Sequence, residues 1–121
     1  MRLAIIGSRS FNNYDLFEKT IFKNYKIENI KEIISGGVEG TDSLAEQFAI
    51  KYSIPMSIFI PDWDLYGEYG EYGDYAVYMR NILIIDSSDE VIAFWDGISK
   101  GTKHSIELAN KAKKKLMIVK V

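Results

Sequence analysis

The sequence contains no cysteine and no long hydrophobic run. Without cysteine the chain cannot form disulfides, thiolate nucleophiles or zinc–thiolate sites. The apolar run near Met1 is too short for a signal peptide, and no segment approaches the length of a membrane span. We therefore expect a cytoplasmic protein without a membrane partner. The formal net charge of −2 also gives no overall attraction to nucleic acid or to anionic lipid.

The chain of 121 residues is long enough for one hydrophobic core and leaves little room for a second. Short apolar runs predict strands at 3–6, 30–35, 56–60, 90–95 and 116–121. The expected helices are 14–25, one that starts at Gly40 or Thr41 and ends before Pro55, one that starts near Tyr75, and 102–114. This alternation predicts one α/β domain, 1–121, with an open parallel five-stranded sheet and helices on both faces.

The segment from Glu32 to Tyr52 joins an expected strand, a glycine-rich turn and the start of a helix. Gly36 and Gly37 follow the apolar run directly, and the sequence GTD begins at Gly40. This order leaves backbone N–H groups without partners at the head of the helix, where the helix dipole also favours negative charge. We expect a phosphate to bind there, although glycine pairs at strand ends are also common as plain turns.

Two further loops carry polar or glycine residues at the carboxyl ends of expected strands. GSRSF follows the first strand, and WDGISKGT follows the fourth with a second Gly-x-x-x-Gly-Thr spacing. Ligands of parallel sheets bind beyond the carboxyl ends of the strands, so we expect the three loops to meet at one edge. Two anion sites there would suit a diphosphate or a nucleotide better than a lone phosphate. The candidate ligand-binding residues are Gly7, Ser8, Arg9, Ser35, Gly36, Gly37, Gly40, Thr41, Asp42, Arg80, Asn81, Trp95, Asp96, Gly97, Gly101 and Thr102.

Several other features allow more than one interpretation. Arg9 and Arg80 could hold a phosphate, or they could be a solvated side chain and half of a surface salt bridge. His104 could be a ligand or a base, but a lone histidine on a helix is more often structural or exposed. Carboxylates beside the two tryptophans could hold Mg²⁺, although their spacing does not require a metal. The Tyr-Gly repeat at 66–74 is expected to be a surface loop whose rings can lie over a ligand.

The chain carries, in order, the motifs IIGSRSF, SGGVEGTDSLAEQFA, IPMSIFIPDWDLYG, RN and VIAFWDGISKGTKHSIELA. In this order they resemble the YspA/YpsA-related (DUF2493-type) branch of the SLOG superfamily, kin to DprA/Smf and LOG proteins. The resemblance implies a Rossmann-like fold with a nucleotide or nucleotide-derived ligand at the glycine loops. The second glycine turn also looks like the GGxGTxxE motif of LOG phosphoribohydrolases, but here Glu107 lies five residues after Thr102. A short lysine-bearing turn is usual before RN in this branch, whereas this chain has the acidic Tyr-Gly repeat.

Three functions are compatible with these features. The first is a module that senses or sequesters a nucleotide, for example an ADP-ribose derivative, which requires donors but no catalytic group. The second is a LOG-like phosphoribohydrolase acting on nucleoside monophosphates, with Glu46 or Glu107 stabilising the ribosyl cation and Arg9 or Arg80 holding the phosphate. The third is a DprA-like contact with nucleic acid, and the net acidity argues against such a partner. Whether the chain is an enzyme and whether it forms a homo-oligomer stay open.

Overall fold

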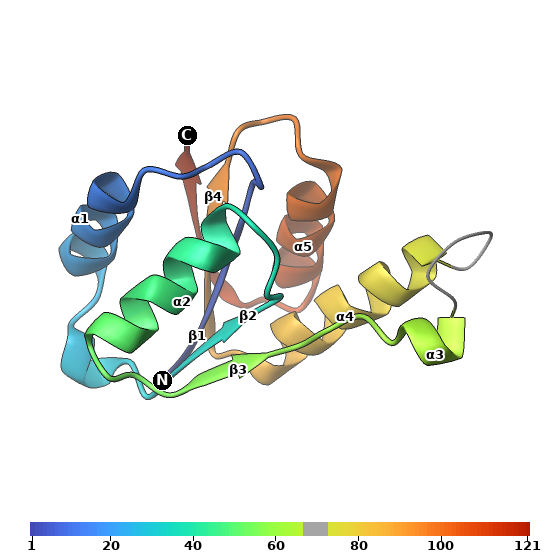
Figure 1. Ribbon diagram of the computed structural model, residues 1–121, viewed down its shortest axis with the longest axis horizontal. Helices are drawn as coiled ribbons and strands as arrows, with labels where there is room; N and C mark the ends of the chain where they lie inside the picture. The colour runs from blue at the N-terminus through green and yellow to red at the C-terminus, as the bar shows by residue number, and fades with distance from the viewer. Residues whose placement is uncertain (67–72) are drawn as a thin grey trace.

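The chain alternates strands and helices, as the computed structural model shows for residues 1–66 and 73–121 (Figure 1). The elements in chain order are β1 Arg2–Gly7, α1 Tyr14–Asn24, the 3₁₀ turn η1 Ile27–Asn29, β2 Glu32–Ser35, α2 Thr41–Lys51, β3 Met56–Ile58, α3 Trp63–Tyr66, α4 Gly73–Ser87, β4 Glu90–Trp95, α5 Lys100–Lys111 and β5 Lys115–Lys120. None of the helices in these two ranges is both long and apolar enough to cross a membrane.

The five strands form one sheet in the order β3-β2-β1-β4-β5, and every neighbouring pair is parallel. The chain first moves outward from β1 to β3 and then crosses back to place β4 on the other side of β1. The strand order therefore reverses between β1 and β4, which is where open α/β sheets bind ligands. This arrangement confirms the predicted Rossmann-like α/β fold with an open parallel sheet.

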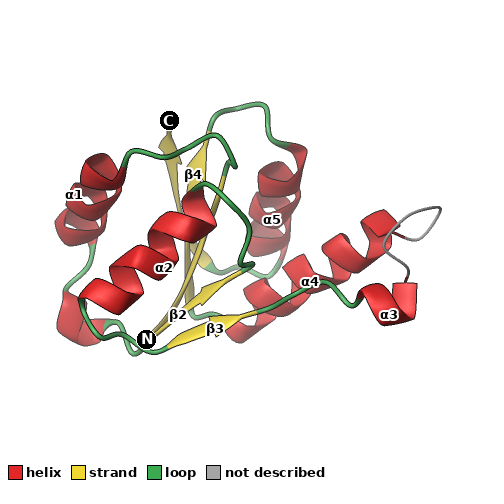
Figure 2. Ribbon diagram, viewed as in Figure 1, coloured by secondary structure: helices red, strands yellow, loops and turns green. Residues whose placement is uncertain are grey.

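Both faces of the sheet are covered by helices, as predicted, because the central strand alternates its apolar side chains between two cores. Leu3 and Ile5 belong to the core that α1 and α2 cover, whereas Ala4 and Ile6 belong to the core that α4 and α5 cover. Figure 2 shows α1 and α2 on one side of the sheet and α5 on the other. A continuous apolar run is thus the pattern of a strand buried on both faces.

Two features of the segment 56–66 differ from the prediction for local reasons. The strand expected to reach Ile60 ends at Ile58, because its partner strand β2 stops at Ser35 and offers no further pairing. The short helix α3 was not expected, and Asp62 caps it by accepting a hydrogen bond from the backbone of Leu65 at 3.0 Å. The predicted Tyr-Gly loop falls largely on residues 67–72, which lie outside the described residues.

The last helix begins and ends earlier than the predicted range 102–114. It starts at Lys100 and ends at Lys111, since Lys113 adopts a left-handed conformation with φ of 56°. The backbone N–H of Lys114 then donates back to the carbonyl of Ala109 at 3.0 Å, as in helix ends closed by a left-handed residue. Because the helix ends at Lys111, residues from Lys115 onward are available to form β5.

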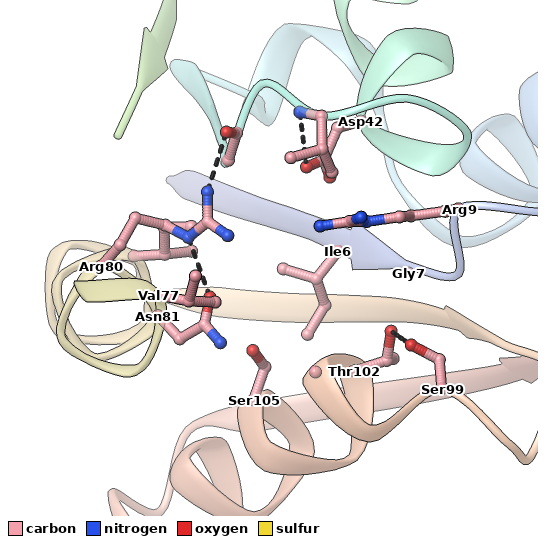
Figure 3. Close-up of a pocket in the computed structure, with 14 residues that line it drawn as sticks. Ile6, Gly7, Arg9, Asp42, Val77, Arg80, Asn81, Ser99, Thr102 and Ser105 are labelled. Carbon is pink, nitrogen blue, oxygen red and sulfur yellow. Dashed lines mark hydrogen bonds between the residues drawn. The ribbon is translucent and has the colours of Figure 1, made fainter. Parts of the chain in front are cut away.

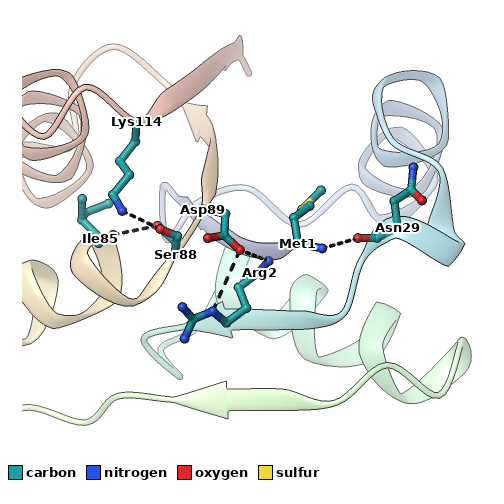
Figure 4. A network of polar contacts seen from close by, with 7 residues as sticks. All are labelled: Met1, Arg2, Asn29, Ile85, Ser88, Asp89 and Lys114. Atoms are coloured by element: carbon teal, nitrogen blue, oxygen red, sulfur yellow. Dashed lines mark hydrogen bonds and ion pairs between the residues drawn. The ribbon is translucent and has the colours of Figure 1, made fainter.

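A polar network joins the amino ends of the strands, at the edge of the sheet opposite the predicted site (Figure 4). The backbone N–H of Arg2 donates to the Asp89 carboxylate at 2.7 Å, which ties the start of β1 to the turn before β4. Lys114 Nζ donates to the backbone carbonyl of Ser88 at 2.7 Å and ties the start of β5 to the same turn. The hydrogen bond from Arg2 lowers the pKa of Asp89.

Candidate functional site

A cavity of about 90 Å³ lies at the carboxyl end of β1, between the loop that follows β2 and the helices α4 and α5 (Figure 3). It is lined by Ile6, Gly7, Arg9, Gly36, Val38, Asp42, Val77, Arg80, Asn81, Ile84, Ser99, Gly101, Thr102 and Ser105. The cavity thus draws on segments that are far apart in the sequence, and it lies at the sheet edge where the sequence predicted a site.

Arg80 contributes a buried positive charge to this cavity. Its side chain is 7% exposed, and Nη1 donates to the carbonyl of Gly36 at 3.0 Å while Nε donates to Asn81 Oδ1 at 3.0 Å. Burial lowers the pKa of Arg80, the Asp42 charge acts against this shift, and the Arg9 charge adds to it. The structure therefore excludes the surface salt bridge that the sequence left open for Arg80.

Asp42 is the carboxylate that lines the cavity, and it is 7% exposed. Burial raises its pKa, while the backbone N–H of Val38, which donates to Asp42 Oδ2 at 3.2 Å, and the charge of Arg80 act against the rise. Gly36 permits this crowding, because a Cβ there would lie 2.8 Å from Arg80 Nη1 and 3.1 Å from Asp42 Oδ2. The first glycine loop is therefore built around an aspartate and an arginine.

Arg9 is the second cation of the cavity and lies on its exposed side. Figure 3 shows its side chain pointing across the cavity in the direction of Arg80. The backbone of Arg9 is held by close packing on Gly40, whose φ is +77° and where a Cβ would lie 2.3 Å from the Arg9 carbonyl oxygen. Gly40 therefore positions Arg9 and does not itself line the cavity.

Ser8 joins three loops and does not line the cavity. Its backbone N–H donates to the carbonyl of Phe94 at 2.9 Å, and its hydroxyl accepts a hydrogen bond from the backbone of Asp96 at 3.0 Å. Its carbonyl accepts from the Thr41 backbone N–H at 3.2 Å and from the Thr41 hydroxyl at 3.0 Å. Ser8 and Thr41 are both fully buried, so their place in the structure is to hold the loops after β1 and β4 against the head of α2.

The loop before α5 supplies its own negative charge. Asp96 Oδ1 accepts hydrogen bonds from the backbone N–H groups of Ile98 and Ser99, both at 2.8 Å, and these bonds lower the pKa of Asp96. These two amides are therefore not available to a ligand. Gly101 and Thr102, in the first turn of α5, line the cavity instead. The first N–H groups of a helix have no partner within the helix, so they suit an anion at this position.

The cavity brings together part of the predicted set. The predicted residues that line it are Gly7, Arg9, Gly36, Asp42, Arg80, Asn81, Gly101 and Thr102. The predicted residues outside its lining are Ser8, Ser35, Gly37, Gly40, Thr41, Trp95, Asp96 and Gly97. Sequence reasoning missed Ile6, Val38, Val77, Ile84, Ser99 and Ser105. Helical spacing could have found several of these, since Val77 and Ile84 lie three and four residues from Arg80 on α4, and Ser105 follows Thr102 by three on α5.

The two glutamates proposed as catalytic groups do not line the cavity. Glu46 on α2 and Glu107 on α5 are both exposed. Among residues 1–66 and 73–121, no three carboxylate, histidine or cysteine side chains gather as they would around a metal ion. Within the lining, the group able to carry negative charge in a reaction is Asp42, and the positive charges come from Arg9 and Arg80.

Known proteins resemble this chain in structure. No family model matches the sequence, and no curated protein does. DNA processing protein A (DprA) from Streptococcus pneumoniae matches 97% of this chain and 49% of its own length, with a TM-score of 0.75 and 23% identity. DNA processing protein A from Helicobacter pylori, described as binding single-stranded DNA, matches 98% of this chain and 64% of its own length, with a TM-score of 0.71 and 25% identity. The chain therefore has the fold of roughly half to two thirds of these proteins.

One expectation about partners is wrong. The net acidity of the chain predicted that nucleic acid is not a partner, whereas a protein that shares this fold is described as binding single-stranded DNA. The physical reason is that the net charge of −2 belongs to the whole chain, whereas recognition depends on the charge at the site. Arg9 and Arg80 are brought together in one cavity despite the acidic composition. The composition of the whole chain is therefore no argument against a nucleic-acid partner.

Proposed function

We propose that the chain binds a nucleotide through a phosphate group in the cavity at the carboxyl end of β1. The observation that carries this proposal is the charge of the lining. Arg9 and Arg80 supply two positive charges and Asp42 supplies one negative charge, which leaves one positive charge in excess. Because Arg80 is buried, its charge is poorly solvated, and a bound anion would compensate it.

The size of the cavity limits what enters it. Its volume of about 90 Å³ is well below the roughly 300–1,000 Å³ of pockets that enclose drug-sized ligands. A phosphate group fits a space of this size, but a whole nucleotide does not. The ribose and base of the ligand would therefore lie outside the cavity, and a fully enclosed ADP-ribose derivative is disfavoured. This geometry is the same for a free nucleotide and for one unit of a longer strand.

The fold neighbours support a second candidate, the binding of single-stranded DNA. The Helicobacter pylori protein that matches nearly all of this chain is described as binding single-stranded DNA. In such a complex one phosphate of the strand would occupy the cavity. Binding would then weaken with salt, since the logarithm of the affinity falls by about 0.7 for each contacted phosphate per tenfold increase in salt concentration. A strand that contacts further phosphates outside the cavity would show a stronger dependence than a free nucleotide with its single phosphate contact.

We also propose that the chain belongs to the SLOG superfamily, near its YspA/YpsA-related branch. Two independent features support this part of the proposal. The sequence carries the superfamily-like motifs in the expected order, and the fold matches that of DNA processing protein A over nearly the whole chain. The hydrolase alternative gains no support, because Glu46 and Glu107 do not line the cavity.

The proposal is tested by replacing the exposed arginine of the cavity. Arg9→Ala should reduce the affinity for nucleoside monophosphates by about ten- to hundredfold, because a hydrogen bond to a charged group contributes about 1.5–3 kcal/mol. The matched control is Arg2→Ala, which removes an exposed arginine at the opposite edge of the sheet. Isothermal titration with nucleoside monophosphates and with oligothymidylate measures both variants. Equal affinities of Arg9→Ala and Arg2→Ala would refute the placement of the phosphate.

A further inference from the structure

Two aromatic rings lie together beside the cavity without lining it. The ring centroids of Tyr78 on α4 and His104 on α5 are 4.7 Å apart, and the ring planes are inclined by 57°. Tyr78 is 45% exposed, and neither ring belongs to the two hydrophobic cores. Burial in a core therefore does not account for this aromatic pair.

A chain of hydrogen bonds connects the pair to the cavity. Arg80 Nε donates to Asn81 Oδ1 at 3.0 Å, and the Asn81 side-chain nitrogen lies 3.4 Å from His104 Nδ1. Arginine has donors only, so the atom of Asn81 that faces Arg80 must be the oxygen. The amide nitrogen of Asn81 therefore faces His104 and donates to Nδ1, which leaves the ring proton of a neutral His104 on Nε2. The imidazole is thus oriented by the buried arginine of the cavity.

The helix geometry places each of the two rings next to a residue that lines the cavity proposed for the phosphate. Tyr78 and Asn81 are three residues apart on α4, and His104 and Gly101 are three residues apart on α5. Residues at this spacing are neighbours on a helix surface, with Cβ atoms about 5–6 Å apart. Asn81 and Gly101 both line the cavity. A ligand whose phosphate enters the cavity would therefore meet the rings with the group next to it.

We propose that Tyr78 and His104 form the surface on which the base of the bound nucleotide stacks. The inference rests on the proposed function, since it assumes that the phosphate occupies the cavity, and it assigns the part of the ligand that remains outside. Every nucleobase has an apolar face that stacks on aromatic rings, so such a surface accepts different bases. The ligand class is therefore a base-bearing nucleotide, free or within a single strand, and a sugar phosphate without a base would bind less tightly.

The experiment compares ligands with and without a base. Isothermal titration measures inorganic phosphate, ribose 5-phosphate, thymidine monophosphate and oligothymidylate against the unmodified chain and its variants. We expect Tyr78→Ile to lose about tenfold in affinity for thymidine monophosphate and none for ribose 5-phosphate. Tyr78→Phe should keep the affinity of both, because it keeps the ring. The matched control is Leu83→Ala, a change at a residue of α4 that is 51% exposed and outside the cavity.

The outcomes separate this inference from the proposed function. Suppose that ribose 5-phosphate binds and that Tyr78→Ile leaves the preference for thymidine monophosphate over ribose 5-phosphate unchanged. The base then does not stack on Tyr78, and the proposed phosphate site is not affected by this result. If Tyr78→Phe loses the preference as Tyr78→Ile does, the hydroxyl and not the ring is responsible, and the stacking surface is refuted. If none of the phosphate-bearing ligands binds the unmodified chain, the proposed function fails and the stacking surface fails with it. A preference that Tyr78→Ile removes in oligothymidylate but not in thymidine monophosphate would assign the surface to strands alone and refute it for free nucleotides.

Discussion

Replacing Gly101 with alanine should raise the stability of the protein and lower its affinity for the ligand. Gly101 is the second residue of α5 and lines the cavity, and a Cβ built there meets nothing within 4 Å. In a helix, glycine is less stable than alanine by about 0.5–1 kcal/mol. Since the protein has room for a methyl group at this position, the Gly101→Ala variant should gain that amount. Because Gly101 lines the cavity, the added methyl group should also reduce the space available to the phosphate that we propose there.

The length of the chain sets how far each change in free energy shifts the melting temperature. An unfolding entropy of about 2.1 cal/mol/K per residue gives about 0.25 kcal/mol/K for 121 residues. The melting temperature of unliganded Gly101→Ala should therefore rise by about 2–4 °C. A ligand at about 100 times its Kd stabilises the unmodified chain by about 2.7 kcal/mol, or about 11 °C. A tenfold loss of affinity would reduce this shift to about 1.4 kcal/mol, or about half.

Thermal unfolding with and without a nucleoside monophosphate measures the two shifts in one assay. The control is Asn110→Ala, which improves helix propensity at an exposed position in the last turn of α5, away from the cavity. This control should raise the melting temperature and keep the full ligand shift. A Gly101→Ala variant that is more stable but keeps the full ligand shift would show that the ligand does not contact the head of α5. A fall in the unliganded melting temperature would show that the position has no free space.

Three other changes test the charges. Asp42→Asn should strengthen phosphate binding in calorimetry, because it removes a like charge from the lining of the cavity. Burial raises the Asp42 pKa, so stability should fall as pH rises from the unfolded value of about 3.9 through the folded value, and urea titrations of Asp42→Asn should show a weaker fall. The Asp89 pKa is lowered by the Arg2 backbone, so its contribution is present above about pH 3.9 and lost as pH falls through the folded value; Asp89→Asn should flatten this acid limb. Arg80→Met should destabilise the protein by about 1–3 kcal/mol in urea unfolding, because it leaves the Gly36 carbonyl without the hydrogen bond that Arg80 Nη1 donates.

Local patterns in the sequence were sufficient for the architecture. The run from Leu3 to Ile6 predicts a strand buried on both faces, and the structure divides its side chains between two cores. The alternation of such runs with helical segments predicts parallel crossovers, and the sheet order confirms them. These inferences succeed because side-chain periodicity is a property of the backbone itself and needs no knowledge of distant residues.

The composition of the site could be predicted only in part, because it depends on which polar groups already have partners. Ser8 and Thr41 lie at positions where the sequence predicts ligand contacts. In the structure, however, both side chains form hydrogen bonds to other loops of the protein. The amides before α5 are taken by Asp96 in the same way. A donor that has found a partner within the protein is no longer available to a ligand, and no local pattern records this.

The sequence by itself determined the strands, the longer helices and the edge of the sheet at which the glycine loops meet. Only the tertiary structure decided that Arg80 is buried and donates to Gly36, which lies 44 residues away in the chain. It also decided that Arg9 and Arg80 share one cavity although the whole chain is acidic. The reason is physical: periodicity acts over a few residues, whereas the charge of a cavity is set by side chains that meet only after the chain has folded.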